Sequence, residues 1–356
     1  MNPKKILIIK LRHHGDVLLT TPLFRVCRDA FPQVQVDALV YQETCPLLEN
    51  NPDLHHVYAI DRTTKGIKRL RHEWALLQRI RKTQYEVIIH LTDQWIGAMI
   101  ARFSGATYRI HLSPIKRKHP FWLNSFTHAV QPPPRGQLHA IELNLLSLKV
   151  LGIHLESVSP QVVLRPNPVA FNKAVALLHE KHIQPGFILV HPAARWPFKC
   201  WSDAKFGTII SGLLNRGLTV VLTSSPSQFE QEMTNHIEQL ALQNTNGQGK
   251  LVNYAGLTDL PTLAALQLQC RFYMGVDSAP MHMAAALNVP QIALFGPSWL
   301  NEWRPWSTQA ITIYAGDYGP LPHPDQINTN DTTRLLDAIP ISVVEEHVSK
   351  MLRQTA

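Results

Sequence analysis

Three segments of the sequence place polar side chains and turn residues at the ends of apolar runs. The first is KLRHHGDVLLTTP, residues 10–22, in which Gly15 permits a tight turn and Asp16 lies where a helix would start. A carboxylate at this position can take a proton from a hydroxyl group, as a general base does. His13 or His14 can be the base instead. Asp16 can also be a simple helix N-cap, because aspartate is favoured there.

The second segment is HPAARWPFKCW, residues 191–201, which follows the apolar run GFILV. A lysine in a loop after a buried strand, close to backbone amides and the start of a helix, can hold a diphosphate. Lys199 is the candidate, and Arg195 can share or replace that role. The alternative is a solvent-exposed loop lysine without a function.

The third segment is MGVDSAPMHMAAALNVPQIALFGPS, residues 274–298. An apolar run ends at Asp277, and Ser278 and Ala279 begin a helix in which a proline follows at the first turn. Backbone amides at the positive end of a helix dipole suit phosphate oxygens. His282, about one turn further, is either a ligand contact or a core residue.

The elements that would position these residues are short β-branched runs that alternate with amphipathic helices. The predicted strands are 5–10, 34–41, 56–61, 85–91, 186–192, 217–225, 250–256, 271–277 and 291–298. The predicted helices are 17–31, 73–82, 139–152, 203–215, 227–242, 260–269 and 279–287. This alternation is typical of parallel sheets covered on both faces, which bind ligands beyond the carboxyl ends of their strands.

We therefore predict an α/β fold with two facing, Rossmann-like, doubly wound domains and a deep cleft between them. The proline-bearing stretch LRPNPVA, residues 164–170, marks the domain boundary. It separates a first Rossmann-like domain, residues 1–165, from a second, residues 166–330. Residues 331–356 are predicted as a helical tail that packs back on the first domain, with a capping box formed by Ser342 and Glu345.

Composition limits the class of protein. A chain of 356 residues with 45% hydrophobic residues is long enough for two globular domains. Its four cysteines form no CxxC pair, which argues against a disulfide framework or a structural zinc site and favours a reducing compartment. The 18 histidines show no HExxH pairing, so we predict no metal site. No apolar run approaches the roughly 20 residues of a spanning helix, and we expect a cytoplasmic protein.

The net charge of +8 predicts an anionic partner. Basic residues cluster at 65–71, 79–82 and 116–118, all in the first half of the chain. Nucleic acid, acidic lipid headgroups and a phosphorylated substrate would each suit them. Nucleic acid is disfavoured, because no recognised binding motif accompanies the charge.

Together, the three segments resemble the lipopolysaccharide heptosyltransferases of glycosyltransferase family 9, which have the GT-B fold. The similarity spans nearly the whole chain and is strongest in KxRxxGDVLLTTP, in FKCW and in GVDSAPMHMAAALNVPQIALFGPS. The opening motif, with LVYQET (39–44) and HLTDQW (90–95), is most similar to the heptosyltransferase III branch. That branch adds a side-branch heptose to the second heptose of the inner core.

The resemblance implies an inverting, metal-independent transfer from ADP-L-glycero-β-D-manno-heptose, with no further cofactor, to the lipid A–Kdo–heptose core acceptor. Asp16 matches the general base, and domain closure would bring it to the donor. The matches on the donor side are Lys199 (phosphate-binding lysine), Asp277 (donor sugar), Ser278 and Ala279 (diphosphate), His282 (the histidine of the motif) and, more loosely, Glu230 (ribose).

On the acceptor side, the resemblance implies that His14, Arg62 and Lys65 bind the phosphates and acidic sugars of the core. It also implies peripheral contact with the cytoplasmic face of the inner membrane. Two alternatives stay open at this point. One is another nucleotide-sugar enzyme of the same fold, with a different donor or an epimerase activity, and the other is a non-catalytic nucleotide-sugar-binding protein.

Overall fold

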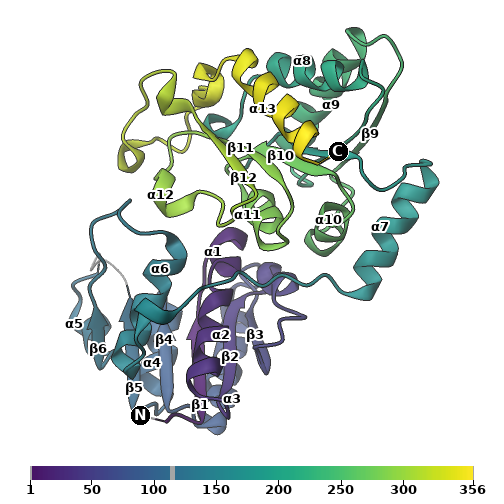
Figure 1. Cartoon of the computed structure of the whole chain (residues 1–356). Coiled ribbons are helices and arrows are strands. Elements are labelled where there is room, and N and C mark those ends of the chain that lie inside the picture. Colours follow the sequence, from purple (N-terminus) through teal and green to yellow (C-terminus); the bar gives the residue numbers. More distant parts are fainter. Residues whose placement is uncertain (1, 113–116, 356) are drawn as a thin grey trace. The chain divides into compact units, whose positions relative to one another are not determined.

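The computed structural model describes residues 2–112 and 117–355 and divides into two compact units. The first unit ends at Arg165 and the second begins at Pro166. Each contains one six-stranded sheet with helices on both faces (Figure 1). The predicted doubly wound α/β architecture is confirmed.

The first sheet is parallel throughout and has the order β3-β2-β1-β4-β5-β6. Its strands are β1 (Lys5–Ile9), β2 (Gln35–Tyr41), β3 (His56–Ile60), β4 (Val87–His90), β5 (Tyr108–Leu112) and β6 (His128–Val130). Strands β1 and β4 are central, and apart from Lys5 and His90 all their residues are apolar and buried, as expected for strands covered on both faces.

The second sheet is also parallel, with the order β12-β11-β10-β7-β8-β9. Its strands are β7 (Ile188–His191), β8 (Thr219–Ser224), β9 (Lys250–Ala255), β10 (Phe272–Val276), β11 (Gln291–Phe295) and β12 (Ala310–Tyr314). Counted from its own first strand, each unit thus has the order 3-2-1-4-5-6. In such sheets the strand order reverses between the first and fourth strands, and this place is called the topological switch point. The crevice beyond the carboxyl ends of these two strands is the usual ligand site.

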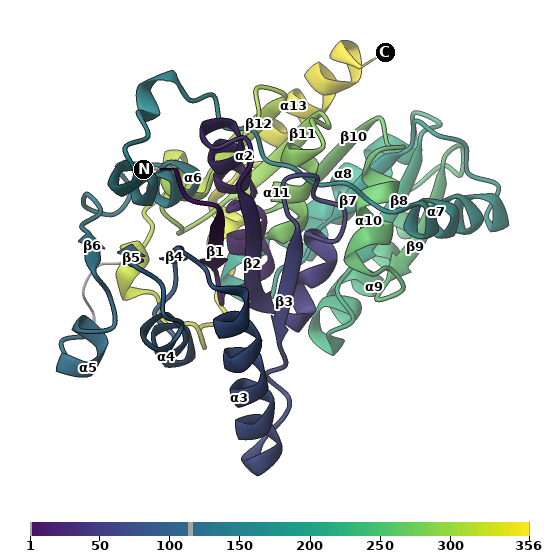
Figure 2. The same ribbon diagram turned by 90° about the horizontal axis from the view of Figure 1, so that it is seen from below.

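The helices of the first unit cover its sheet on two sides. Figure 2 shows α2 and α6 on one face and α3, α4 and α5 on the other. The bounds are α1 (His14–Leu18), α2 (Thr21–Ala30), α3 (Gly66–Thr83), α4 (Trp95–Phe103), α5 (Pro120–Leu123) and α6 (Ala140–Leu145), with 3₁₀ turns η1 (Gln42–Leu47), η2 (Leu146–Leu151) and η3 (Leu155–Ser157).

Two helices predicted in the first unit are each divided in the structure. The predicted helix 17–31 is two helices, α1 and α2, because Pro22 lacks an N–H and sits in the first turn of a new helix. The predicted helix 139–152 is α6 followed by the 3₁₀ turn η2, which ends where Gly152 adopts a left-handed conformation with φ 81°.

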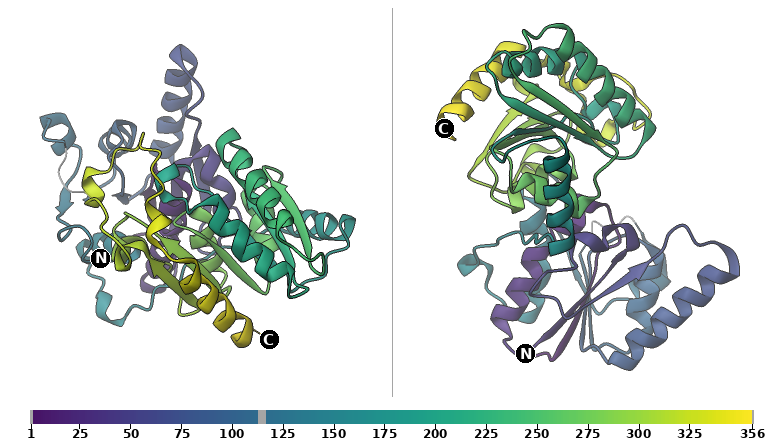
Figure 3. Two further views of the ribbon diagram at one scale, coloured as in Figure 1. Left: turned by 90° about the horizontal axis from the view of Figure 1, so that it is seen from above. Right: turned by 90° about the vertical axis from the view of Figure 1, so that its right-hand side faces the viewer.

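The helices of the second unit form two layers on its sheet (Figure 1 and Figure 3). One layer contains α8 (Asp203–Leu214), α9 (Gln228–Gln243) and α13 (Ile341–Gln354), and the other contains α7 (Pro168–Glu180), α10 (Leu260–Gln267) and α11 (Ala279–Ala286). The remaining elements are α12 (Leu300–Trp303) and the turns η4 (Pro197–Lys199), η5 (Ala315–Asp317), η6 (Pro324–Gln326) and η7 (Leu335–Ala338).

The end of the chain belongs to the core of the second unit. Val344, Val348 and Met351 of α13 are buried among the apolar side chains of α8 and of the central strands. The predicted capping box is wrong, because α13 begins at Ile341 after Pro340 and Ser342 already lies inside the first turn. The expected packing of residues 331–356 on the first domain stays a prediction.

Candidate active site

In the second unit, three loops at the carboxyl ends of neighbouring strands bring polar side chains together. Lys199 lies in η4, after β7, and its Nζ is 2.6 Å from Oδ2 of Asp277, which directly follows β10. Ser298, which follows β11, donates from its Oγ to the same carboxylate oxygen at 2.5 Å. The side chains of Lys199 and Asp277 are only 16% and 6% exposed, so the pair is mostly removed from water.

An indole ring lies next to the lysine of this cluster. The Lys199 ammonium and the guanidinium carbon of Arg195 each lie 5.5 Å from the centre of the Trp196 ring, within the range of a cation–π contact. Trp196 in turn stacks on Phe198 at 5.9 Å. Arg195 is exposed, whereas Lys199 is ion-paired at the switch point. The geometry therefore favours Lys199 over Arg195 for the phosphate role.

The start of α11 lies immediately after Asp277. Ser278 is the N-cap residue, with extended backbone at φ −153° and ψ 170°, and Ala279 is the first helical residue. The Ser278 side chain makes no capping hydrogen bond, and the Met281 amide donates to the Ser278 carbonyl at 3.1 Å. Since Pro280 has no N–H, the amides of Ser278 and Ala279 are the ones that this helix start can offer to a ligand. Amides in this position can bind an anion.

His282 lies one turn further along α11. It is buried, and its ring meets that of Trp303 edge-on at 6.5 Å. The packing of the ring is that of a core residue, and its contact with a ligand stays a prediction.

Glu230 lies at the start of α9, close to the end of β8. Its Oε2 accepts a hydrogen bond from the Ser225 amide at 3.2 Å, and its own amide donates to Ser227 Oγ at 3.4 Å. Because both bonds fix the loop after β8, Glu230 has a structural role whether or not it also binds a ribose.

A buried histidine that sequence reasoning missed lies near Glu230. His191, the last residue of β7, has its Nδ1 3.0 Å from Thr223 Oγ1. Burial lowers the pKa of His191 to about 4, and the charge of the Glu230 carboxylate opposes this shift. The imidazole is therefore neutral near pH 7.

In the first unit, Asp16 is the third residue of α1, whose N-cap is His13. The N-cap alternative for Asp16 is therefore wrong, and its carboxylate is left for other contacts. Lys10, which directly follows β1, places its Nζ 3.9 Å from Asp16 Oδ1 and donates to Asn144 Oδ1 at 3.2 Å. Asn144 is buried and donates to the Leu19 carbonyl at 3.1 Å. These contacts hold the Lys10 ammonium in place beside the partly exposed Asp16 carboxylate.

Two of the three predicted acceptor residues, His14 and Arg62, both contact Glu43. The Nε2 atom of His14 lies 3.1 Å from the Glu43 carbonyl oxygen, and Arg62 forms an ion pair with the Glu43 carboxylate. The Arg62 guanidinium also lies 4.3 Å above the Tyr41 ring. Burial lowers the pKa of His14, while the Glu43 carbonyl and carboxylate counteract that change.

The third acceptor residue, Lys65, is exposed at the N-cap of α3, where its side chain makes no capping hydrogen bond within the described residues. Of the basic cluster 116–118, Lys116 lies outside the described residues. Arg117 donates from its Nε to the Asp93 carbonyl at 2.8 Å.

A further acidic residue was missed at the same edge of the first sheet. Asp93 follows β4, the partner of β1 at the switch point, and its Oδ1 lies 3.3 Å from Arg12 Nη2. The sequence signal that could have identified Asp93 is its position in HLTDQW, three residues after the end of a buried strand. Among residues 2–112 and 117–355, no three His, Cys, Asp or Glu side chains are grouped as metal ligands would be.

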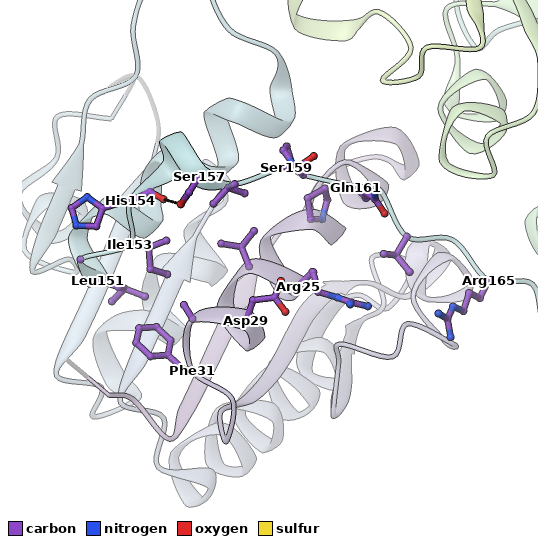
Figure 4. A pocket seen from close by; sticks show the side chains of 17 residues that line it. Arg25, Asp29, Phe31, Leu151, Ile153, His154, Ser157, Ser159, Gln161 and Arg165 are labelled. Atoms are coloured by element: carbon purple, nitrogen blue, oxygen red, sulfur yellow. Dashed lines mark hydrogen bonds between the residues drawn. The ribbon is translucent and has the colours of Figure 1, made fainter.

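A cavity of about 830 Å³ lies elsewhere in the first unit (Figure 4). It is lined by the later turns of α2 and by the segment after η2, including Arg25, Asp29, His154 and Gln161. None of the predicted site residues, all of which the structure describes, is among its lining residues. The candidate site is therefore the polar strand ends and not this cavity.

Solved structures share this fold over almost the whole chain. A family 9 glycosyl transferase from Veillonella parvula superposes with a TM-score of 0.83 at 20% identity, covering 99% of this chain and 98% of that one. The E. coli ADP-heptose lps heptosyltransferase II gives 0.76 at 22% identity, covering 98% and 99%. With two sheets of order 3-2-1-4-5-6 and polar switch points, the protein has the fold of the GT-B glycosyltransferases.

Sequence comparison defines the family. Residues 73–333 match glycosyltransferase family 9 (heptosyltransferase). The protein named lipopolysaccharide heptosyltransferase 3 from Escherichia coli is 36% identical over 343 residues, which are 96% of this chain and 97% of the relative. The protein of the same name from strain K12 is 32% identical and covers 97% of each chain. The chain belongs to glycosyltransferase family 9 and is a glycosyltransferase.

Proposed function

We propose that the chain transfers a heptose, with inversion, from ADP-L-glycero-β-D-manno-heptose to the second heptose of the lipopolysaccharide inner core, as the heptosyltransferase III type does. The acceptor assignment is supported by 36% identity to a lipopolysaccharide heptosyltransferase 3 across 96% of the chain. The donor assignment is supported by structures of an E. coli heptosyltransferase of the same fold, solved with ADP and with ADP-2-deoxy-2-fluoro heptose. Family membership favours a transferase over an epimerase or a non-catalytic binder.

The observation that carries the donor site is the cluster of Lys199, Asp277 and Ser298. As the bond between the anomeric carbon and the diphosphate oxygen breaks, negative charge develops on ADP. The Lys199 ammonium and the backbone amides of Ser278 and Ala279 stabilise that charge, because they are fixed before the reaction. The Asp277 carboxylate, already aligned by Ser298, accepts hydrogen bonds from hydroxyls of the donor sugar.

The proposed base is Asp16. Its carboxylate takes the proton of the acceptor hydroxyl while that oxygen forms a bond to the anomeric carbon, on the face opposite the departing ADP. A single displacement of this kind inverts the anomeric centre. Lys10 is a positioning residue, because its ammonium lies 3.9 Å from the carboxylate and is itself held by Asn144.

We assign acceptor binding to His14, which lies in α1 after β1, and to Arg62 and Lys65, which lie in the loop between β3 and α3. Guanidinium and ammonium groups suit core phosphates and acidic sugars. No helix of the described residues is both long and apolar enough to cross a bilayer. We place the enzyme at the cytoplasmic face of the inner membrane, where its acceptor would be exposed.

The test of this mechanism compares wild type, Asp16→Asn and Lys199→Gln with ADP-heptose and purified core acceptor. ADP release and product mass are measured together. We expect Asp16→Asn to lower kcat by about 10²–10⁴-fold with donor affinity unchanged. We expect Lys199→Gln to weaken ADP binding as well as turnover, because it removes charge from the leaving-group site.

Two outcomes would contradict parts of the proposal. If Asp16→Asn retained turnover within about tenfold, Asp16 would not be the base. If wild type released no ADP with any core acceptor, the assigned reaction would be wrong. The branch position is tested by mass spectrometry of core oligosaccharide from a strain lacking the protein, which should lose one branch heptose and keep the main chain.

A further inference from the structure

Helix α3 displays an apolar stripe to solvent. Ile67, Leu70 and Trp74 are 71%, 65% and 62% exposed, although residues of these types usually lie inside. Their spacing of three and four residues puts them on one side of the helix. The buried residues of α3 are Leu76 and Ile80, from its second half, so the stripe contributes nothing to the core of the first unit.

The first turns of α3 extend beyond the sheet that its later turns cover. Figure 2 shows the helix rising toward the sheet from its N-terminal end, and the right-hand view of Figure 3 shows α3 and α2 on opposite sides of that sheet. The stripe is therefore presented on a projecting part of the first unit.

Exposed cations flank the stripe. Lys65, Lys68 and Arg71 are all exposed, and the neighbouring Glu73 is engaged by Arg69 through an ion pair of 2.6 Å. The excess of positive charge is a property of the whole first unit. Residues 1–165 contain 22 Lys and Arg against 12 Asp and Glu, a net +10, whereas residues 166–356 contain 12 against 14, a net −2.

A second exposed apolar stripe lies on the same face of this sheet. Trp95, Met99 and Phe103 follow one another at intervals of four residues on α4, which packs beside α3, and all three are exposed. Arg117 lies 5.2 Å from the Trp95 ring. Exposed aromatic and aliphatic side chains with a cation beside them thus occur on α4 as well as on α3, and Figure 2 shows both helices on the same face of the sheet.

We propose that α3 docks the enzyme on an anionic phospholipid surface. Ile67, Leu70 and Trp74 insert between the headgroups and the acyl chains, and Lys68 and Arg71 bind lipid phosphates. An amphipathic helix with Trp and Leu on one face and Lys and Arg beside it lies in a membrane interface in this way. A protein partner fits less well, because lysine is depleted in protein–protein interfaces. The inference deepens the proposed function, since a lipid-linked acceptor is found on such a surface.

The experiment measures co-sedimentation of the full chain with phosphatidylcholine vesicles that contain about 30% phosphatidylglycerol. Ile67→Ser/Leu70→Ser/Trp74→Ser is compared with Val169→Ser/Leu242→Ser/Leu257→Ser, a matched set of exposed apolar residues in the second unit. We expect the α3 variant to bind at least about tenfold more weakly than wild type and the control set to bind as wild type. Lys68→Gln/Arg71→Gln should weaken binding and reduce its dependence on salt.

Turnover separates this inference from the proposed function. The α3 variant should use a deacylated, water-soluble acceptor at the wild-type rate and should lose activity only on acceptor embedded in vesicles. If the α3 variant bound vesicles as tightly as wild type, or if wild type did not bind them at all, the inference would be overturned. If wild type bound vesicles but transferred no heptose to either acceptor, the proposed function would fail and the docking surface would stand.

Discussion

Lys199 and Asp277 illustrate how one ion pair can serve both the fold and a ligand. Taking two charges out of water is costly, and the short contact between Nζ and Oδ2, with Ser298 on the same oxygen, offsets that cost. A donor diphosphate would give the ammonium a second anion at the same place. The residue types at these positions could be predicted from the sequence. Their pairing could not, because it depends on β7 and β10 being neighbours although 78 residues separate the partners.

His191 predicts a measurable pH dependence of stability. Its folded-state pKa of about 4 lies below the value near 6.5 of an unfolded chain, so the unfolded state binds the proton more readily. The contribution of neutral His191 to the free energy of unfolding is fully present above pH 6.5. It is lost as the pH falls toward 4, by about 1.4 kcal/mol per pH unit. Urea titrations between pH 7.5 and 4.5 measure how the free energy of unfolding changes with pH. In His191→Asn it should fall less steeply with falling pH than in wild type, by the roughly 1.4 kcal/mol per pH unit that corresponds to one proton.

The matched control for this measurement is His72→Asn, which changes an exposed histidine on α3. Its slope should equal that of wild type. An unchanged slope in His191→Asn would show that the histidine takes up its proton equally well in the folded and unfolded chains.

At the scale of elements, buried strands were easier to predict than edges and helix starts. The apolar runs of β1, β2, β4, β7 and β10 are dictated by burial on both faces. In contrast, β5 and β6 were missed because they contain polar residues or are short, as in YRIHL and HAV. Strand β12 (AITIY) was missed although it is apolar, and it is an edge strand in which only Ile313 is buried. The beginning of α3 was missed because its exposed first turns show no core-facing pattern. Helix α7 was missed because Pro168, its first residue, was interpreted only as a boundary signal.

Helix α13 should be required for the stability of the second unit. Val344→Ala/Val348→Ala removes two buried side chains from its core and should lower the free energy of unfolding by about 2–5 kcal/mol. Glu345→Ala/Glu346→Ala changes the exposed side of the same turns and should have an effect within about 0.5 kcal/mol. Denaturant unfolding monitored by tryptophan fluorescence measures both. Equal stability of the two variants would mean that α13 is not part of the core.

At the scale of the whole molecule, hydrogen exchange can assign the donor to one unit. With saturating ADP, we expect slower amide exchange in the loops after β7 and β10, residues 192–200 and 277–281, because bound anions engage and shield their backbone N–H groups. The loop at residues 10–16 should change little without acceptor. Protection confined to the first unit would contradict the assignment of the donor to the second.

The shared origin of the donor cluster in three loops has a consequence for protein engineering. Lys199, Asp277 and Ser298 lie in register only because β7, β10 and β11 are adjacent in one sheet. Grafting one of these loops onto another scaffold would transplant a side chain without its partners. A chimera designed to change sugar specificity therefore has to exchange the complete segment from Pro166 onward, including α13, as a single cassette.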